Sequence, residues 1–475
     1  MALLSEEVKV IEQTKVFPPP GSVPTTSLPL TFLDLQWLLS HHMQRTYFYE
    51  FPHPINHFLE TLLPSLKSSL SLTLQHFFPF AANLVCPPPP ARPHILFTDG
   101  DSVSLTVVES TADFNFLTAH HPRPVKALYP LVPKLAPARV EGDKRIEPLM
   151  ALQLTVFPDS GICIGVRFNH VVADGKTLHH FLKSWALICK TGGDSTLLAQ
   201  ELRLPSHDRA TIKGPHGQEL AFLNTWWSLA STWKNDNDDD DEKSVLDCRN
   251  IDNVRATFVL PRARIEKLKH WLTNQLSKDE NSTSFHMSSY VATCALIWAC
   301  LAKSEAKNST EKINKDDEPY YFAIVAECRS RLEFPLPATY FGNCLAVSFV
   351  PVKRKELLGE NGTVAAAKAI GKEVREMNKQ ALKELENWVM KYKKIEESHR
   401  QHVTVTGSPK FGLYEVDFGW GRPKKSEAVH FSDSSTFSLV ESRDEKGGVE
   451  VGLTLSRDRM SRFSAILEKI LSELV

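Results

Sequence analysis

The stretch that decides the fold is F-N-H-V-V-A-D-G, at residues 168–175. Before it, residues 161–168 alternate between apolar side chains and other residues, which predicts a strand. After it, apolar side chains recur at helical spacing over residues 178–189, which predicts an amphipathic helix. His170 and Asp174 therefore lie on a tight connection from strand to helix. A histidine held between two packed elements is fixed in place, as a general base must be.

A second motif, D-F-G-W-G, occupies residues 417–421. Two glycines around an aromatic residue are typical of a tight bend with close backbone approach. A histidine four residues before an aspartate is a weak pattern alone. Together with the second motif, H-V-V-A-D-G at residues 170–175 resembles the paired signature of the plant BAHD acyltransferases, which move acyl groups from coenzyme A thioesters. The order, separation and chain length match, and the resemblance covers nearly the whole chain.

The resemblance implies a mixed α/β fold of two similar-sized, chloramphenicol-acetyltransferase-like domains, with the active site in a channel between them. On this basis we expect an N-terminal half at residues 1–195, which carries His170. A crossover rich in Pro and Gly follows at residues 196–220. The C-terminal half, residues 221–475, carries the second motif, and part of it can pack on the first domain.

His170 is the residue that we expect to perform the chemistry. Acyl transfer from a thioester to a hydroxyl needs a base of near-neutral pKa, and histidine has one. No G-x-S-x-G elbow is present to indicate a covalent acyl-enzyme. Asp174 resembles the aspartate of a Ser-His-Asp relay. The family resemblance instead implies that Asp174 turns away, bonds a nearby arginine and, with Gly175, shapes the loop.

Asp417 has two interpretations. We place it in the catalytic set with His170, as some descriptions of the family do. The resemblance also implies a structural role, in which Asp417 pairs with an arginine, here Arg329, and holds the channel in shape. Gly419, Trp420 and Gly421 then form the bend, and the Trp420 indole N–H is a hypothetical donor to the oxyanion.

Coenzyme A carries phosphates and therefore requires cations. Arg262, Arg264, Lys267 and Lys269 cluster on one predicted helix, with Ser284 shortly after it. This arrangement resembles the coenzyme-binding flank of the family, for which we select Lys267, Lys269 and Ser284. An ordinary basic surface helix is the alternative.

The acceptor and donor follow from two further resemblances. L-P-L-T-F-L-D-L-Q-W-L-L at residues 28–39 and Y-F-G-N-C at residues 340–344 resemble the branch that acylates anthocyanin, flavonoid and phenolic glucosides. That branch includes malonyl and hydroxycinnamoyl transferases. We favour malonyl-CoA as the co-substrate, whose free carboxylate needs a cation. Lys176 is a candidate for this cation, and an ordinary surface residue in the first turn of the helix is the alternative. Asp34, in the first segment, is either a lining residue of the active-site entrance or a helix cap.

Two other functions are compatible with the same residues: a thioester hydrolase, and a catalytically silent binding protein on this fold. Release of free thiol from acyl-CoA, with and without a phenolic glucoside, separates the three functions.

Composition excludes several classes of protein. The 475 residues carry a formal net charge of −1, which argues against nucleic acid or an acidic membrane as the main partner. The 8 cysteines include no C-x-x-C pair, so we expect neither a metal site nor a bound cofactor. The N-terminus lacks the basic-then-apolar order of a signal peptide, and no apolar run is long enough to cross a bilayer. We therefore expect a cytosolic monomer.

Elsewhere, strands and helices alternate along the chain, as an α/β or α+β protein requires. Residues 109–147 read as largely irregular, and the acidic run at residues 235–243 reads as a solvated loop. The predicted strands lie at 8–16, 94–97, 102–108, 148–157, 255–260, 320–326, 345–350, around Tyr414, at 436–442 and at 449–455. The predicted helices lie at 55–74, 176–190, 262–272, 284–302, 365–392 and 457–474.

Overall fold

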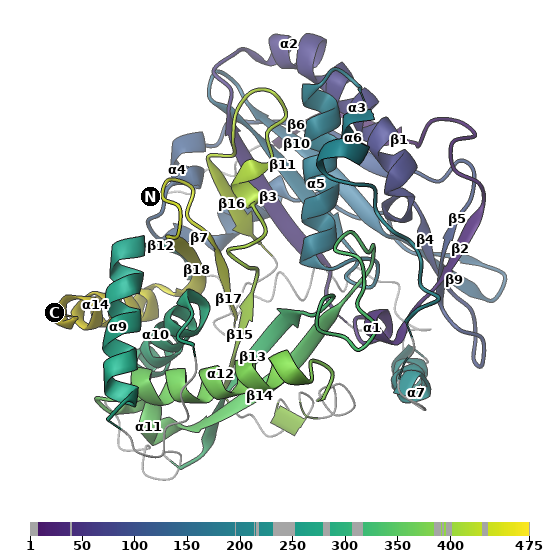
Figure 1. Ribbon diagram of the computed structural model, residues 1–475. Coiled ribbons are helices and arrows are strands. Elements are labelled where there is room, and N and C mark those ends of the chain that lie inside the picture. Colours follow the sequence, from purple (N-terminus) through teal and green to yellow (C-terminus); the bar gives the residue numbers. More distant parts are fainter. Residues whose placement is uncertain are drawn as a thin grey trace.

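The structure is a computed structural model. It describes residues 8–38, 40–194, 196–212, 214, 218–230, 252–278, 286–305, 317–383, 391, 394–395, 401–429 and 436–474. Within these residues the chain forms three β-sheets with helices packed against them, the mixed α/β architecture that was expected (Figure 1). The acidic run at residues 235–243 lies outside the described residues.

The first sheet belongs mainly to the N-terminal half. Its six strands, in spatial order, are β1 (Val8–Val16), β6 (Val103–Ser110), β10 (Met150–Phe157), β11 (Gly161–Phe168), β3 (Met43–Glu50) and β16 (Lys425–Ala428). β10 and β11 form the predicted hairpin, in which Met150 lies opposite Phe168. Helices α3 (Leu63–His76) and α5 (Gly175–Lys190) lie against each other, and the Trp185 indole donates to the Leu66 carbonyl at 3.1 Å. The helix that follows His170 is thus fixed by the core.

The second sheet belongs mainly to the C-terminal half. Its seven strands, in spatial order, are β14 (Leu345–Lys353), β13 (Pro319–Glu327), β15 (His402–Thr406), β17 (Thr436–Glu441), β18 (Val449–Ser456), β12 (Asn253–Leu260) and β7 (Arg123–Pro124). The core of this half is completed by four long helices: α9 (Arg262–Leu276), α10 (Ser289–Glu305), α12 (Gly362–Lys379) and α14 (Arg457–Glu473).

The third sheet includes the predicted strand at residues 94–97 and two short strands at the end of the stretch that the sequence predicted to be largely irregular. Its five strands are β2 (Thr26–Pro29), β5 (His94–Phe97), β4 (Asn83–Cys86), β9 (Lys144–Pro148) and β8 (Arg139–Glu141). The short strands β8 and β9 were missed because Pro and charged residues interrupt their pattern. The remaining short elements are α1 (Phe32–Leu35), α2 (Ile55–His57), η1 (Phe58–Leu62), η2 (Phe78–Phe80), α4 (Phe114–Thr118), η3 (Val125–Leu131), α6 (Thr196–Glu201), α7 (Gln218–Ala230), α11 (Arg354–Leu358) and η7 (Leu413–Glu415).

The two large sheets exchange strands. β16 comes late in the chain but pairs with β3 of the first sheet, and β7 comes early but pairs with β12 of the second (Figure 1). The exchanged strands are joined by a buried carboxylate, because Glu427 on β16 accepts hydrogen bonds from Arg123 on β7 and Arg255 on β12, both at 2.6 Å. Burial alone would raise the pKa of Glu427, but these two arginines and Lys425 lower it by more than burial raises it. The pKa therefore lies below its usual value, and the carboxylate is ionised. The expectation allowed part of the C-terminal half to pack on the first domain, as β16 does, whereas the pairing of β7 with the second sheet was not expected.

Two predictions of secondary structure were wrong. The segment around Tyr414 is the 3₁₀ turn η7 rather than a strand, and it begins after Gly412, whose φ is +66°. The helix predicted at residues 365–392 begins earlier, at Gly362, and α12 ends at Lys379, because Gln380 leaves the helical region with φ −142° and ψ 81°.

No helix among the described residues combines the length and the apolar character needed to cross a membrane.

Candidate active site

His170 lies on the loop between β11 and α5, as the sequence predicted. The loop is closed by its own polar groups, since the Asn169 side chain accepts from the Val171 N–H at 3.0 Å and the Val172 N–H donates to the Asn169 carbonyl at 3.2 Å. His170 is 8% exposed, at the edge of the core. The side chain is therefore held by packing and keeps only a small exposed fraction.

The His170 ring stacks face to face on Trp37, with ring centroids 4.1 Å apart and an angle of 8° between the planes. Its Nδ1 atom is buried without a hydrogen-bond partner among the described residues. Burial lowers the pKa of His170 below 6.5, although the charges of Asp174 and Asp34 raise it. The imidazole is therefore neutral at neutral pH, the form that accepts a proton.

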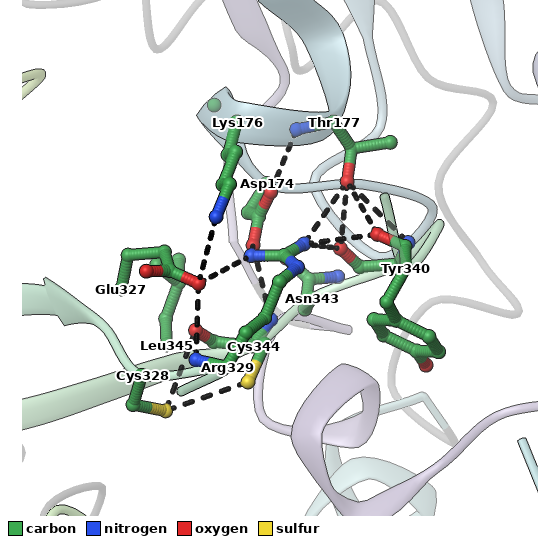
Figure 2. A network of polar contacts seen from close by, with 12 residues as sticks. Asp174, Lys176, Thr177, Glu327, Cys328, Arg329, Tyr340, Asn343, Cys344 and Leu345 are labelled. Carbon is green, nitrogen blue, oxygen red and sulfur yellow. Dashed lines mark hydrogen bonds and ion pairs between the residues drawn. The ribbon is translucent and has the colours of Figure 1, made fainter. Parts of the chain in front are cut away.

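Both side-chain oxygens of Asp174 have partners other than His170 (Figure 2). One oxygen caps α5 by accepting from the Thr177 N–H at 2.9 Å, and the other accepts from the Cys344 N–H at 3.0 Å. Arg329 forms a buried ion pair with Asp174 at 2.8 Å. Burial raises the pKa of Asp174, but Arg329 and the two N–H groups lower it to below 3.8. This geometry is that of a loop-shaping residue and not of a Ser-His-Asp relay.

Arg329 follows β13 and connects the His170 loop to the second sheet. Its guanidinium donates to Thr177 Oγ1 at 3.1 Å and to the carbonyls of Tyr340 and Gly342 at 3.2 and 3.0 Å. It also contacts Glu327 at 3.1 Å (Figure 2). The first turn of α5 is thus tied to residues 340–344, the Y-F-G-N-C segment.

Asp34 is fully buried and binds several partners, whereas the sequence predicted either a lining residue of the entrance or a helix cap. It forms the predicted cap, in which the Thr31 N–H and hydroxyl both donate to Oδ2, at 3.0 and 2.7 Å. Oδ2 also binds Arg209 at 2.7 Å, and the Asn343 N–H donates to Oδ1 at 3.1 Å. Arg209 comes from the crossover segment, so Asp34 joins three parts of the chain that are distant in sequence.

Asn343 and Trp37 are the residues that sequence reasoning missed. The Asn343 amide donates to the carbonyls of His170 and Val171 at 2.9 and 3.1 Å. Trp37 supplies the surface on which the His170 ring stacks. Both lie in segments that were singled out for their resemblance, at residues 340–344 and 28–39, but no spacing rule indicates that they meet at His170.

The second motif lies at the opposite end of α5. Asp417 pairs with Lys190, the last residue of α5, at 2.7 Å, and its other oxygen accepts from the Gly419 and Gly421 N–H groups, both at 2.9 Å. These glycines have φ of +111° and +108°, a conformation that other residues rarely adopt. The 16 residues of α5 span about 24 Å. His170 precedes the first of them, so Asp417 is out of reach of the atoms that react at His170.

Three expectations about this motif are therefore corrected. The Asp417–Arg329 pair is wrong, because Arg329 binds Asp174 and Asp417 binds Lys190. Direct chemistry by Asp417 does not fit its position. Trp420 stacks on Phe418, with centroids 5.3 Å apart, at the remote end of α5, so its indole N–H cannot serve an oxyanion beside His170.

The predicted binding residues Lys176 and Lys269 each have a carboxylate partner, and Lys267 lies at the surface. The Lys176 ammonium lies 3.5 Å from Glu327 (Figure 2), so a carboxylate already compensates its charge. Lys267 and Lys269 lie on α9, where Lys267 is exposed and Lys269 pairs with Glu266 at 3.0 Å. Ser284 lies outside the described residues. Within the described part of the chain, no cluster of side chains could hold a metal ion.

Two mixed sheets, with a histidine on a strand-to-helix loop, are consistent with the expected class of chloramphenicol-acetyltransferase-like acyltransferases. A family model described as the Transferase family matches residues 6–470, and the chain belongs to this family, the BAHD acyl-CoA-dependent acyltransferases. Acyl-CoA is the co-substrate of the family.

Similar proteins support this assignment over the full length. The chain is 39% identical to the coumaroyl-CoA:anthocyanidin 3-O-glucoside-6''-O-coumaroyltransferase 1 of Arabidopsis thaliana, over 97% of each chain. It is 38% identical to the malonyl-coenzyme A:anthocyanin 3-O-glucoside-6''-O-malonyltransferase of Dahlia pinnata, over 96% of each. The crystal structure of vinorine synthase superposes with a TM-score of 0.67 at 21% identity, covering 99% of this chain and 98% of that one, which shows a shared fold.

Proposed function

We propose that this enzyme transfers an acyl group from acyl-CoA to a sugar hydroxyl of a flavonoid, anthocyanin or phenolic glucoside, with His170 as the general base. The observation that carries the proposal is the state of His170: neutral, stacked on Trp37, and free of the carboxylate four residues later. The acceptor class rests on relatives whose names specify anthocyanin glucosides.

The proposed reaction needs no covalent enzyme intermediate. Neutral His170 removes the proton from the acceptor hydroxyl while that oxygen attacks the thioester carbonyl. The tetrahedral intermediate collapses with cleavage of the C–S bond, and the imidazolium gives its proton to the leaving thiolate. The products are the ester and free coenzyme A, and His170 returns to its neutral form.

The other residues at the site position the base. Asp174 caps α5 and binds Arg329, and Asn343 binds the carbonyls of His170 and Val171. None of these contacts occupies Nε2 of His170, so that atom is the one we assign to proton transfer. We further propose that Lys267, Lys269 and Ser284 contribute to coenzyme A binding.

For the donor we propose malonyl-CoA, as the sequence favoured. A malonyl group carries a carboxylate, and Lys176, 36% exposed at the start of α5, is the cation that we assign to it. One observation favours the second candidate, a hydroxycinnamoyl donor such as coumaroyl-CoA. Glu327 already pairs with Lys176, and an uncharged acyl group needs no free cation.

Release of free thiol tests the function. The enzyme is incubated with malonyl-CoA or coumaroyl-CoA, with and without an anthocyanin 3-O-glucoside. The proposal predicts thiol release that depends on the glucoside, with a product heavier by one acyl group. Release without acceptor indicates a thioester hydrolase, and absence of release with both donors contradicts the proposal.

Two substitutions test the donor assignment. An ionic hydrogen bond to the malonyl carboxylate is worth roughly 1.5–3 kcal/mol, so Lys176→Met should lower malonyl transfer by about tenfold to a hundredfold. Transfer from coumaroyl-CoA should change little. Glu327→Gln keeps the shape of the side chain but releases Lys176, and should shift the preference further toward malonyl-CoA. Equal losses with both donors, or faster native transfer from coumaroyl-CoA, would reject malonyl-CoA.

A further inference from the structure

Residues 411–420, which we call the strap, contact α5 from its first residue to its last. Four pairs of side chains mark its course: Phe411 on His179 with centroids 4.9 Å apart, Glu415 on Lys183 at 2.6 Å, Phe418 on Trp185 with centroids 4.9 Å apart, and Asp417 on Lys190 at 2.7 Å. The strap therefore connects the D-F-G-W-G bend at one end of α5 with the His170 loop at the other. Nothing in the reaction described above uses its upstream part.

At the start of α5 the strap closes over Gly175. A Cβ atom placed on Gly175 would lie 3.1 Å from Cε2 and 3.3 Å from Cζ of Phe411, closer than ordinary van der Waals contact. The Phe411 ring is half-buried and stacks on His179 at an angle of 23°, which restricts its movement on that side. Gly175 is not among the glycines with positive φ, so the short distance to Phe411, and not the backbone conformation, is what favours glycine at this position.

His179 fixes the other side of this contact. Burial and the nearby charge of Arg45 lower the pKa of His179 to about 3, so the ring is neutral and has one N–H. The Gly175 carbonyl can only accept, so His179 Nδ1–H donates to it, and the Tyr47 hydroxyl donates to Nε2 at 3.0 Å. Gly175 is thereby held by His179 through its carbonyl and by Phe411 over its Cα.

We propose that Phe411 is a positioning residue for His170. By pressing on Gly175 it sets the first turn of α5, and Asp174 and His170 precede that turn by one and five residues. The D-F-G-W-G bend then acts on catalysis indirectly, since it fixes the far end of the same strap. This inference rests on the proposed function, in which His170 is the base.

The test is a pair of substitutions at one contact. Gly175→Ala adds a single methyl group at the first residue of α5, and the nearest atoms to it all belong to Phe411. A displacement of about 1 Å at a catalytic group can cost up to about a hundredfold in rate. We expect Gly175→Ala to lower kcat by about ten- to a hundredfold with both KM values nearly unchanged. The double variant Gly175→Ala/Phe411→Leu, in which the smaller side chain makes room, should recover most of that loss.

Three controls separate the explanations. Phe116→Leu makes the same change at an exposed phenylalanine on α4 and should leave kcat unchanged. Thermal unfolding of each variant shows whether it folds. If Gly175→Ala does not fold, the test passes to Phe411→Leu alone, which must then lower kcat while KM stays nearly unchanged. His170→Ala tests the proposed function independently of the strap. Full activity of Gly175→Ala, or a loss that Phe411→Leu does not rescue, overturns the inference even when His170→Ala is inactive.

Discussion

The two ends of α5 carry the same kind of interaction, an aspartate paired with a cation, but in opposite surroundings. At the first end, Asp174 and Arg329 are 2.8 Å apart with side chains 0% and 1% exposed. At the last end, Asp417 and Lys190 are 2.7 Å apart with side chains 25% and 51% exposed. Distance alone does not distinguish the two pairs, whereas burial does.

Burial determines what each pair contributes. An unpaired charge in the interior is strongly destabilising, whereas an exposed pair is worth little. The Asp174–Arg329 pair therefore holds the His170 loop against residues 340–344. The Asp417 site is held instead by its two backbone N–H donors, with Lys190 as a minor addition.

The largest predicted effect is that of Arg329→Met. It leaves Asp174 charged and unpaired in the interior, which should lower the free energy of unfolding by roughly 3–5 kcal/mol. Chemical denaturation measures this change. Arg264→Met, which breaks an exposed pair with Glu468, is the matched control and should change little. An Arg329 variant as stable as the control would remove the contrast between the two ends.

An intermediate effect is predicted for Asp417→Ala. The substitution removes the acceptor of the Gly419 and Gly421 N–H groups, and this should cost about 1–3 kcal/mol. Asp417→Asn retains an acceptor oxygen and should cost less. Chemical denaturation gives the free energy of unfolding of both variants, and kcat is measured for each. An Asp417→Asn enzyme that is fully stable yet inactive would place this residue in the chemistry.

The smallest effect is predicted for Lys190→Met. An exposed ion pair contributes about 0.2–1 kcal/mol, and salt screens it. The free energy of unfolding should fall by no more than this amount, and the difference from wild type should shrink between low and high salt. A loss comparable to that of Arg329→Met would show that exposure does not separate the two pairs.

Local patterns predicted much of the fold and the place of His170 within it. The hairpin of β10 and β11, the helix α5 and the position of His170 between them all follow from periodicity within one stretch. The short strands β8 and β9 were missed because their stability comes from pairing with β4 and with each other. The exchange of β7 and β16 between sheets is likewise a tertiary choice that no local pattern encodes.

The charged residues of the site could be named from the sequence, but their ion-pair partners were harder to predict. The sequence assigned Arg329 to Asp417 and left the arginine partner of Asp174 unnamed. Only the fold shows that Arg329 binds Asp174 and that Asp417 binds Lys190. Trp37 and Asn343 were within segments already marked, but their contact with His170 joins residues far apart in the chain. The roles of His170 and of the coenzyme-binding residues remain predictions.

The pH dependence of kcat/KM, measured for wild type and for His170→Ala, tests the central claim most directly. The base must be neutral, so activity is present above its pKa and is lost as pH falls through it. Because burial lowers the pKa of His170, the acidic limb of the wild-type profile should have its midpoint below 6.5. His170→Ala should lower kcat/KM by at least about a hundredfold, lose that limb and unfold at the wild-type temperature. Activity of His170→Ala within a few-fold of wild type, with the acidic limb intact, would contradict the account.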